Sequence, residues 1–168
     1  MLDILEDDAA DVIAFVQECD AADLHVFTTI HGVDAEREIF AAILNHPKLD
    51  RATALEIFHV CNPAFYENEL TRGVAEDELA VDEEDQVFLD IMQMAYDRLT
   101  KGRPMRKRFS APCLREWEKF PHVCPTTFKR WPLTSDQIGA SDGETPRPSI
   151  IYDYSKIKLS YEIWLRRH

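Results

Sequence analysis

The sequence predicts a mainly α-helical protein, a compact bundle of αα-hairpins with an irregular, Pro-rich C-terminal part. Apolar residues recur at helical spacing through the first hundred of the 168 residues, and most of these runs begin beside an aspartate. Seven of the nine prolines lie beyond Gly102. We expect a single domain, residues 1–168, with an acidic helical body at 1–102 and a basic extension at 103–168 packed on it. A chain of this length buries roughly two thirds of its unfolded surface.

The first two helices are each indicated by an aspartate cap and an apolar stripe. Asp7 or Asp8 caps the first, and Asp20 caps the second, which Gly32 ends. The stripe of the first helix consists of Val12, Ile13, Phe15 and Val16. The stripe of the second consists of Leu24, Phe27 and Ile30. Both patterns have the 3.6-residue period of a helix with one buried face.

The next two helices form a hairpin. Asp34 opens the first of them, whose apolar face is made by Ile39, Phe40, Ile43 and Leu44. Pro47 ends this helix, because the residue before a proline is pushed out of the α region. Asp50 then caps a helix over 51–61, and this helix stops before Asn62 and Pro63.

A long helix is expected at 83–101, and the pattern changes after it. Its apolar face contains Phe88, Ile91, Met92, Ala95 and Leu99, with Gly102 past its end. Beyond it we expect short helices at 113–120 and 126–131 and a surface loop at 135–148. The segment 150–168 has two interpretations, a short strand through Ile157, Leu159 and Tyr161 or a final helix, and Trp164 favours the helix.

Charge is distributed unevenly along the chain. Residues 1–100 carry 24 Asp and Glu against 5 Lys and Arg, a net charge of −19. Residues 101–168 carry 7 Asp and Glu against 14 Lys and Arg, a net charge of +7. The basic stretch 103–108 follows directly on the acidic body, and we expect it to pair within the molecule rather than to bind nucleic acid.

The tripeptide His-Val-Cys occurs twice, at 59–61 and at 122–124, and supplies the side chains of a zinc site. On a helix, residues two apart point about 200° apart, so His59 and Cys61 do not share a metal. His122 and Cys124 lie between two prolines, and an extended segment would place both on one face. Together with Cys113, they are the candidate ligands of a metal ion or the candidate residues of a thiol-dependent enzyme. The alternative, which we prefer, is that the cysteines are small buried thiols, so that the protein has no metal or cofactor.

The most acidic stretch, residues 67–90, is the candidate binding surface. One interpretation is a solvated helix N-terminus that the helix dipole favours. The other is a negative surface that docks a basic partner. The residues of this predicted surface are Glu67, Glu69, Glu76, Asp77, Glu78, Asp82, Glu83, Glu84 and Asp85.

The hairpin resembles a bacterial family of small helical domains of unknown function. These domains carry the pattern I-x-N-x-P-x-x-D-x-x-T-A-L-x-x-F, whose residues here are Ile43, Asn45, Pro47, Asp50, Thr53, Ala54, Leu55 and Phe58. The resemblance covers roughly residues 24–100 and leaves the basic extension out. It implies a helical fold rather than catalysis. Small acidic proteins of this kind resemble the immunity proteins of bacterial toxin systems.

These observations favour a non-enzymatic, cytoplasmic protein that binds another protein. The start of the chain has no signal-peptide pattern, and no apolar run is long enough to span a membrane. No common hydrolase or phosphate-loop motif is present. The leading hypothesis is an immunity protein that neutralises a basic toxin domain. The alternatives are an enzyme or metal protein that uses His122 and Cys124, and a helical adaptor or homodimer.

Overall fold

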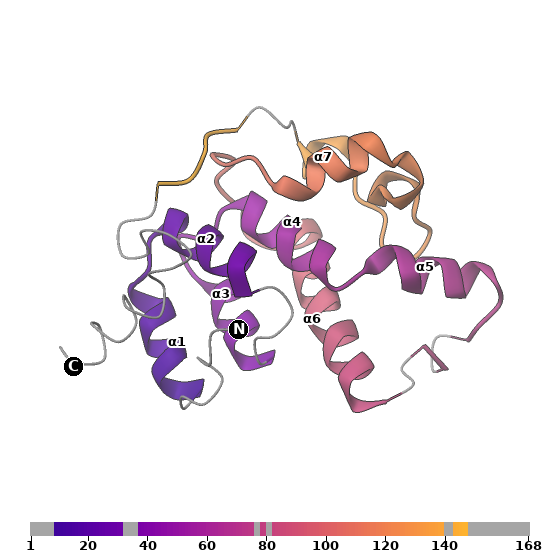
Figure 1. Ribbon diagram of the computed structural model, residues 1–168, viewed down its shortest axis with the longest axis horizontal. Helices are drawn as coiled ribbons and strands as arrows, with labels where there is room; N and C mark the ends of the chain where they lie inside the picture. The colour runs from indigo at the N-terminus through magenta and orange to yellow at the C-terminus, as the bar shows by residue number, and fades with distance from the viewer. Residues whose placement is uncertain (1–8, 32–36, 76–77, 80–81, 140–142, 148–168) are drawn as a thin grey trace.

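Helices make up nearly all the regular structure of the protein, as the sequence predicts. The computed structural model describes residues 9–31, 37–75, 78–79, 82–139 and 143–147 (Figure 1). Within these ranges the β-pairing consists of two isolated bridges, Asp50 to Arg106 and Phe109 to Glu144. The α-helices are α1 (Ala9–Glu18), α2 (Ala21–His31), α3 (Arg37–Asn45), α4 (Arg51–Val60), α5 (Pro63–Thr71), α6 (Glu83–Thr100), α7 (Pro112–Lys119) and α8 (Ser135–Ile138). Two short 3-10 helices, η4 (Pro121–Val123) and η5 (Pro125–Thr127), lie between α7 and α8.

Helix α4 lies at the centre of the fold. It packs against α2, α5, α6 and α7, while α3 packs between α1 and α6. All of residues 51–58 are buried, so this helix is enclosed on every side. Its apolar residues, with Phe15, Phe40 and Ile91, form one continuous core. A helix enclosed in this way brings its polar residues into the interior, where they require hydrogen-bond partners.

The predicted aspartate caps are confirmed where the structure describes them. Asp20 Oδ1 accepts hydrogen bonds from the N–H groups of Ala22 and Asp23 at 2.8 and 2.9 Å. Asp50 Oδ1 accepts from Ala52 N at 2.9 Å. Asp82 was not predicted as a cap, but it caps α6 in the same way and accepts from Asp85 N at 2.9 Å. Each cap satisfies amide groups that the first turn of a helix leaves without an intrahelical partner. The predicted caps Asp7, Asp8 and Asp34 lie outside the described residues.

Two predictions about the irregular parts of the chain are wrong, and one helix was not predicted. The helix before Asn62 ends where expected, but Pro63 then begins the unpredicted α5, because its fixed φ suits the first position of a helix. The expected helix at 126–131 is reduced to η5. The expected loop beyond 134 contains α8, whose first turn is held by a capping box between Thr134 and Gln137. The strand and helix interpretations of 150–168 both lie outside the described residues.

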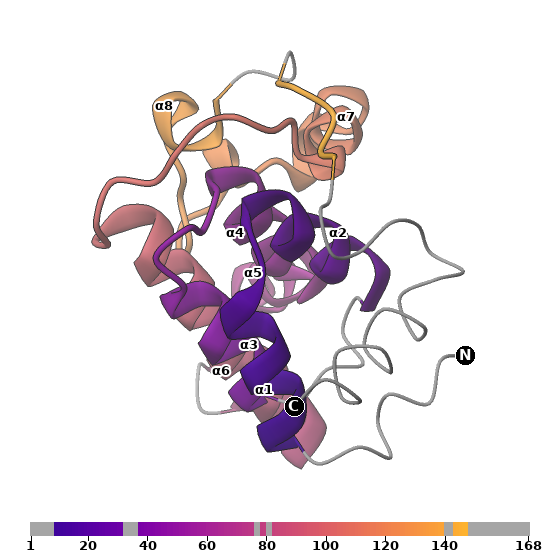
Figure 2. The ribbon, with the colours of Figure 1, turned by 90° about the vertical axis from the view of Figure 1, so that its left-hand side faces the viewer.

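The basic extension crosses the helical body on the side of α2 and α4, with α7 above α4 (Figures 1 and 2). Arg51 N donates to Arg106 O at 2.9 Å, and Glu144 N donates to Arg108 O at 2.9 Å. The Trp131 indole donates to Gln93 Oε1 on α6 at 3.1 Å. The first and third of these hydrogen bonds join described residues of the extension to the helical body, and the second lies within the extension. No helix among the described residues is both long and apolar enough to cross a membrane.

Candidate functional site

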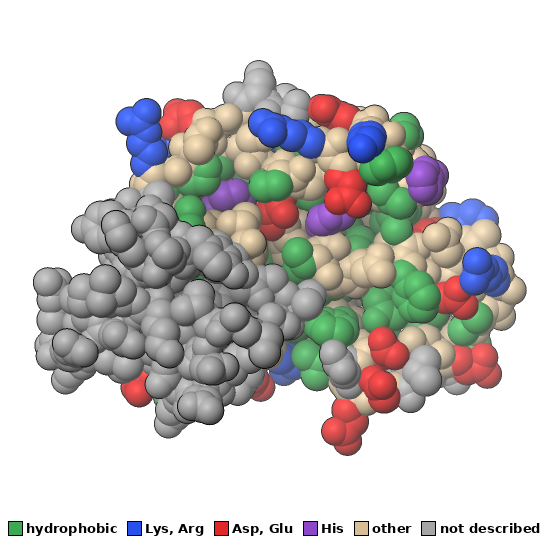
Figure 3. Space-filling model, in the orientation of Figure 1, with side chains coloured by type: hydrophobic (Ala, Val, Ile, Leu, Met, Phe, Trp, Pro, Cys, Tyr) green, Lys and Arg blue, Asp and Glu red, His purple; other side chains and the backbone are tan. Residues whose placement is uncertain are grey.

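The exposed acidic residues gather where α5 and the start of α6 meet. Glu78, Asp82 and Glu83 are exposed, and acidic side chains are visible over the beginning of α6 (Figure 3). Within the described part of the chain, none of these three carboxylates forms an ion pair. Glu69 is different, because it pairs with Arg72 at 2.7 Å. Glu76 and Asp77, and the side chain of Glu84, lie outside the described residues.

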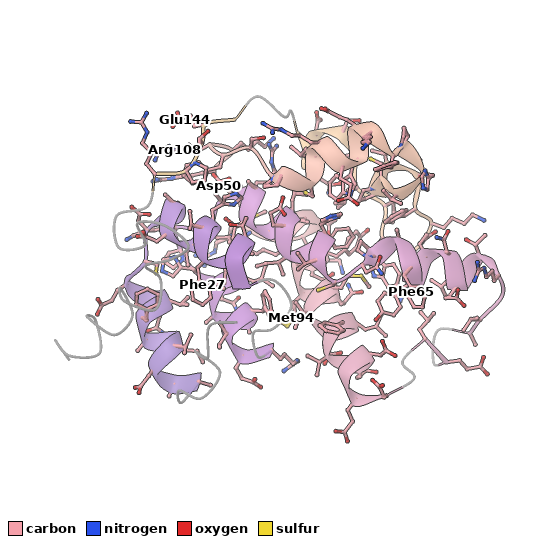
Figure 4. All side chains as sticks on the ribbon, viewed as in Figure 1. Phe27, Asp50, Phe65, Met94, Arg108 and Glu144 are labelled. Carbon is pink, nitrogen blue, oxygen red and sulfur yellow. The ribbon has the colours of Figure 1, made fainter. Side chains whose placement is uncertain are left out.

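An exposed aromatic ring lies on α5, next to the tyrosine that contacts the first turn of α6. Phe65 on α5 is 49% exposed, a large value for a phenylalanine, and points away from the core (Figure 4). Its ring meets the Tyr66 ring edge-on, with centroids 5.2 Å apart. The Tyr66 hydroxyl donates to Asp85 Oδ1 at 3.2 Å, which connects α5 to the first turn of α6. We call Phe65, Glu78, Asp82, Glu83 and Asp85 the acidic face.

Glu67 does not belong to this face, and its predicted place in a docking surface is wrong. It is 7% exposed. Its two carboxylate oxygens accept hydrogen bonds from the backbone N–H groups of Lys129 and Arg130, at 2.5 and 3.0 Å. Because both oxygens are directed into the molecule, this carboxylate holds the extension against α5.

Two more buried carboxylates hold the extension in the same way. Asp50 Oδ2 accepts from Arg108 N at 2.9 Å, while its other oxygen caps α4 (Figure 4). Glu56 Oε1 accepts from Cys113 N at 2.7 Å. The pairing of the basic stretch with the acidic half is therefore made through the backbone. The Arg108 side chain pairs instead with Glu144, at 3.0 Å, within the extension.

Two substitutions of Glu56 distinguish the effect of its hydrogen bond on stability from the effect of its charge. Burial, partly opposed by the hydrogen bond from Cys113 N, raises the pKa of Glu56 above its ordinary value. A raised pKa in the folded state means that stability is lost as pH rises through that pKa. Glu56→Gln keeps an acceptor without the charge and should stay within about 1 kcal/mol of the wild type at pH 7. Glu56→Ala leaves the Cys113 amide unpaired and should cost about 1–3 kcal/mol.

Urea unfolding of both Glu56 variants at pH 5 and pH 7 tests this assignment. The free energy of unfolding of the wild type should fall relative to that of Glu56→Gln as pH rises. Equal losses for the glutamine and alanine variants at pH 7 would show that the hydrogen bond to Cys113 is not what Glu56 contributes.

Among the described residues, two cavities lie between the helical body and the extension. The larger, of about 430 Å³, is lined by Arg51, Lys107, Phe109, Ser135, Asp136, Gly139 and Gly143. The smaller, of about 310 Å³, contains His25 and Arg115 in its lining. His25 is buried, its Nδ1 lies 3.2 Å from Thr53 Oγ1, and burial lowers its pKa to about 4. The sequence analysis found neither cavity, because each is built from residues far apart in the chain.

The two His-Val-Cys tripeptides have different surroundings, and neither forms a cluster. His59 lies in the last turn of α4, with its Nε2 3.1 Å from Glu116 Oε2, whereas Cys61 is buried just after the helix. The extended arrangement expected for residues 122–124 is wrong at His122, which lies in η4, while Cys124 just after it has extended backbone angles. Among the described residues, no three His, Cys, Asp or Glu side chains are grouped as metal ligands.

The buried cysteines are poorly suited to thiol chemistry. Burial raises the pKa of Cys61 to about 12, and burial together with Glu56 raises the pKa of Cys113 well above its ordinary value. The thiolate is the form that attacks substrates and binds metals. Without a bound metal, Cys113 is therefore held as a thiol.

Comparison with known proteins adds a family match for the helical body. Searches of curated proteins and of solved structures gave no significant match. A scan of protein-family models gave a match that covers α2 to α6 and leaves out the basic extension. Residues 19–100 match the model of a domain of unknown function, DUF4274, which agrees with the resemblance of the hairpin to an uncharacterised helical family.

Proposed function

We propose that the protein is a non-enzymatic binding protein whose acidic face docks on a basic surface of another protein. We further propose that it acts as an immunity protein, which neutralises a bacterial toxin by covering the basic site of that toxin. The observation that carries the proposal is that Glu78, Asp82 and Glu83 are exposed and have no ion-pair partner in the described chain. The exposed Phe65 on α5 adds an apolar ring that contacts Tyr66, the residue whose hydroxyl joins α5 to Asp85.

Unpaired carboxylates and an exposed aromatic ring are both features that suit a protein interface. Aromatic side chains supply much of the binding energy when they enter a pocket of the partner. Unpaired carboxylates speed association with a basic surface and fix its orientation. Toxins that act on nucleic acids have basic active sites, so an inhibitor with this face would be complementary to them.

Coexpression tests the immunity role directly. The C-terminal domain encoded by the gene directly upstream is expressed in a bacterial host, with and without this protein. The proposal expects growth to be arrested by that domain alone and restored by coexpression. A domain that arrests growth equally in both cases would contradict the immunity role for that pair.

Charge reversal tests the acidic face once the complex has been purified. Glu78→Lys with Glu83→Lys should slow association about tenfold at low ionic strength, because steering depends on these charges. Asp82 is left in place because it caps α6. The matched control is Asp11→Lys with Glu118→Lys, two exposed acidic positions on α1 and α7 that give the same change in net charge.

Stopped-flow association rates at two salt concentrations distinguish the outcomes. The Glu78 and Glu83 variant should lose most of the salt dependence, and the control should keep it. Equal slowing of both variants would mean that only net charge matters, and the acidic face would then have no specific role.

A further inference from the structure

The guanidinium of Arg51 is a buried charge with few partners. Arg51 is 7% exposed, and its Nε is buried without a hydrogen-bond partner. Its Nη1 donates to Asp136 O at 3.4 Å, a long distance for a hydrogen bond. Burial lowers its pKa, although the charge of Asp50 opposes that change. A buried cation is costly unless hydrogen bonds or an opposite charge compensate it.

Asp50 stabilises the charge of Arg51 through its own negative charge, without a hydrogen bond to the guanidinium. Both of its oxygens are engaged by backbone amides, those of Ala52 and Arg108. In the described part of the chain, Arg51 forms no salt bridge with any carboxylate. The guanidinium therefore retains donor capacity on the side where it lines the larger cavity.

A second cation lies at the same cavity. Lys107 is exposed, lines the cavity, and donates to Asp136 O at 3.3 Å. Both cations are thus directed to one carbonyl oxygen through long hydrogen bonds, which a stronger acceptor could replace. Ser135 adds a hydroxyl to the lining, and the volume of about 430 Å³ is in the range of small-molecule sites.

The turn at Gly139 is fitted closely to the guanidinium. Gly139 has φ +78°, and a Cβ at this position would lie 2.1 Å from Arg51 Nη2. A side chain there would displace the arginine, so the backbone is adapted to hold it against the cavity wall. This close approach explains a glycine at this position better than the turn alone.

From these contacts we propose that the larger cavity binds the phosphate group of a small phosphate-bearing molecule, with Arg51 and Lys107 as its ligands. An arginine fork with a lysine point charge is a usual combination for phosphate, and two cations match a dianion. Phe109 forms an apolar wall against which the rest of the molecule can lie. Asp136 also lines the cavity, and its carboxylate opposes the anion.

Calorimetric titration of the intact protein with inorganic phosphate, and then with phenyl phosphate, tests this site. Constant ionic strength separates binding from screening. We expect one saturable site. Lys107→Gln should weaken binding about tenfold because it removes a charge-assisted hydrogen bond. Asp136→Asn should tighten it. The matched control is Arg106→Gln, an adjacent exposed cation that does not line the cavity.

Two results of these titrations would contradict the proposed phosphate site. Absence of saturable binding of either probe at millimolar concentration, or equal weakening by Lys107→Gln and Arg106→Gln, would do so. Arg51→Gln should abolish binding if it folds, and the exposed Lys107 keeps the test valid if it does not. The Glu78 and Glu83 variant should bind phosphate normally, so failure of the acidic-face proposal is separable from failure of this one.

Discussion

Replacement of Glu67 by alanine is expected to lower the free energy of unfolding by about 3–5 kcal/mol, because two amides would lose a buried charged acceptor. Glu67 on α5 receives hydrogen bonds from Lys129 N and Arg130 N, which lie more than sixty residues later in the chain. Glu67→Gln should cost less, since its amide oxygen still accepts one of the two hydrogen bonds.

The matched control is Glu69→Ala, two residues away on the same helix. Glu69 forms an ion pair with Arg72, whose side chain is 74% exposed, and such pairs contribute about 0–1 kcal/mol. Urea unfolding gives the change in free energy for each variant. Native-state hydrogen exchange adds a local readout, because the amides of Lys129 and Arg130 should exchange faster in Glu67→Ala.

The result also separates two roles for Glu67. A docking residue, as the sequence analysis predicted, would change association with a partner and leave the stability of the free protein nearly unaltered. If Glu67→Ala and Glu69→Ala had equally small effects on unfolding, the hydrogen bonds to residues 129 and 130 would have no importance for the fold.

Much of the helical body could be predicted because its signals are local. Asp20, Asp50 and Asp82 each cap a helix within three residues of themselves, so the sequence contains the whole interaction. The apolar stripes are equally local, since their spacing sets which face is buried. Pro63 shows the limit of this reasoning, because a proline that follows the end of one helix can also be the first residue of the next.

The candidate sites could be predicted only in part, since their decisive contacts join distant segments. The exposed acidic face follows from local charge density, and Glu78, Asp82 and Glu83 were identified in this way. Glu67 lies in the same acidic stretch, but its burial depends on residues 129 and 130. The cavity that Arg51 and Lys107 line depends on the path of the extension, which caps and stripes do not specify. Charged residues of α4 lie on a helix that is buried on every side, and such residues require partners within the fold.

His25 should make the protein unstable in acid. It is 2% exposed on α2, its ring packs on Phe109 with centroids 5.8 Å apart, and Thr53 Oγ1 lies within hydrogen-bond distance. Burial lowers its pKa from 6.5 to about 4, although the charge of Asp50 opposes this change. The smaller cavity that it lines also contains Arg115 and Glu144, of opposite charge. The neutral ring is therefore the form that this environment favours.

The sign of the pH effect follows from the lowered pKa. In the unfolded chain His25 binds a proton near pH 6.5, whereas in the folded chain it does so only near pH 4. Its contribution to stability is complete above pH 6.5 and is lost as pH falls from 6.5 to 4. A difference of this size corresponds to about 3 kcal/mol. Other groups titrate in the same range. The informative quantity is therefore the difference in the free energy of unfolding between the wild type and His25→Gln.

That difference should shrink by about 3 kcal/mol between pH 7 and pH 4, because glutamine has no proton to gain. Urea unfolding across this range measures it, and NMR titration of the His25 ring gives its pKa in the folded state directly. The control is His122→Gln, at an exposed position of η4, which should follow the wild-type curve. A His25 ring that titrates near pH 6.5 would mean that water reaches it, and the packing of Phe109 over this histidine would then not hold in solution.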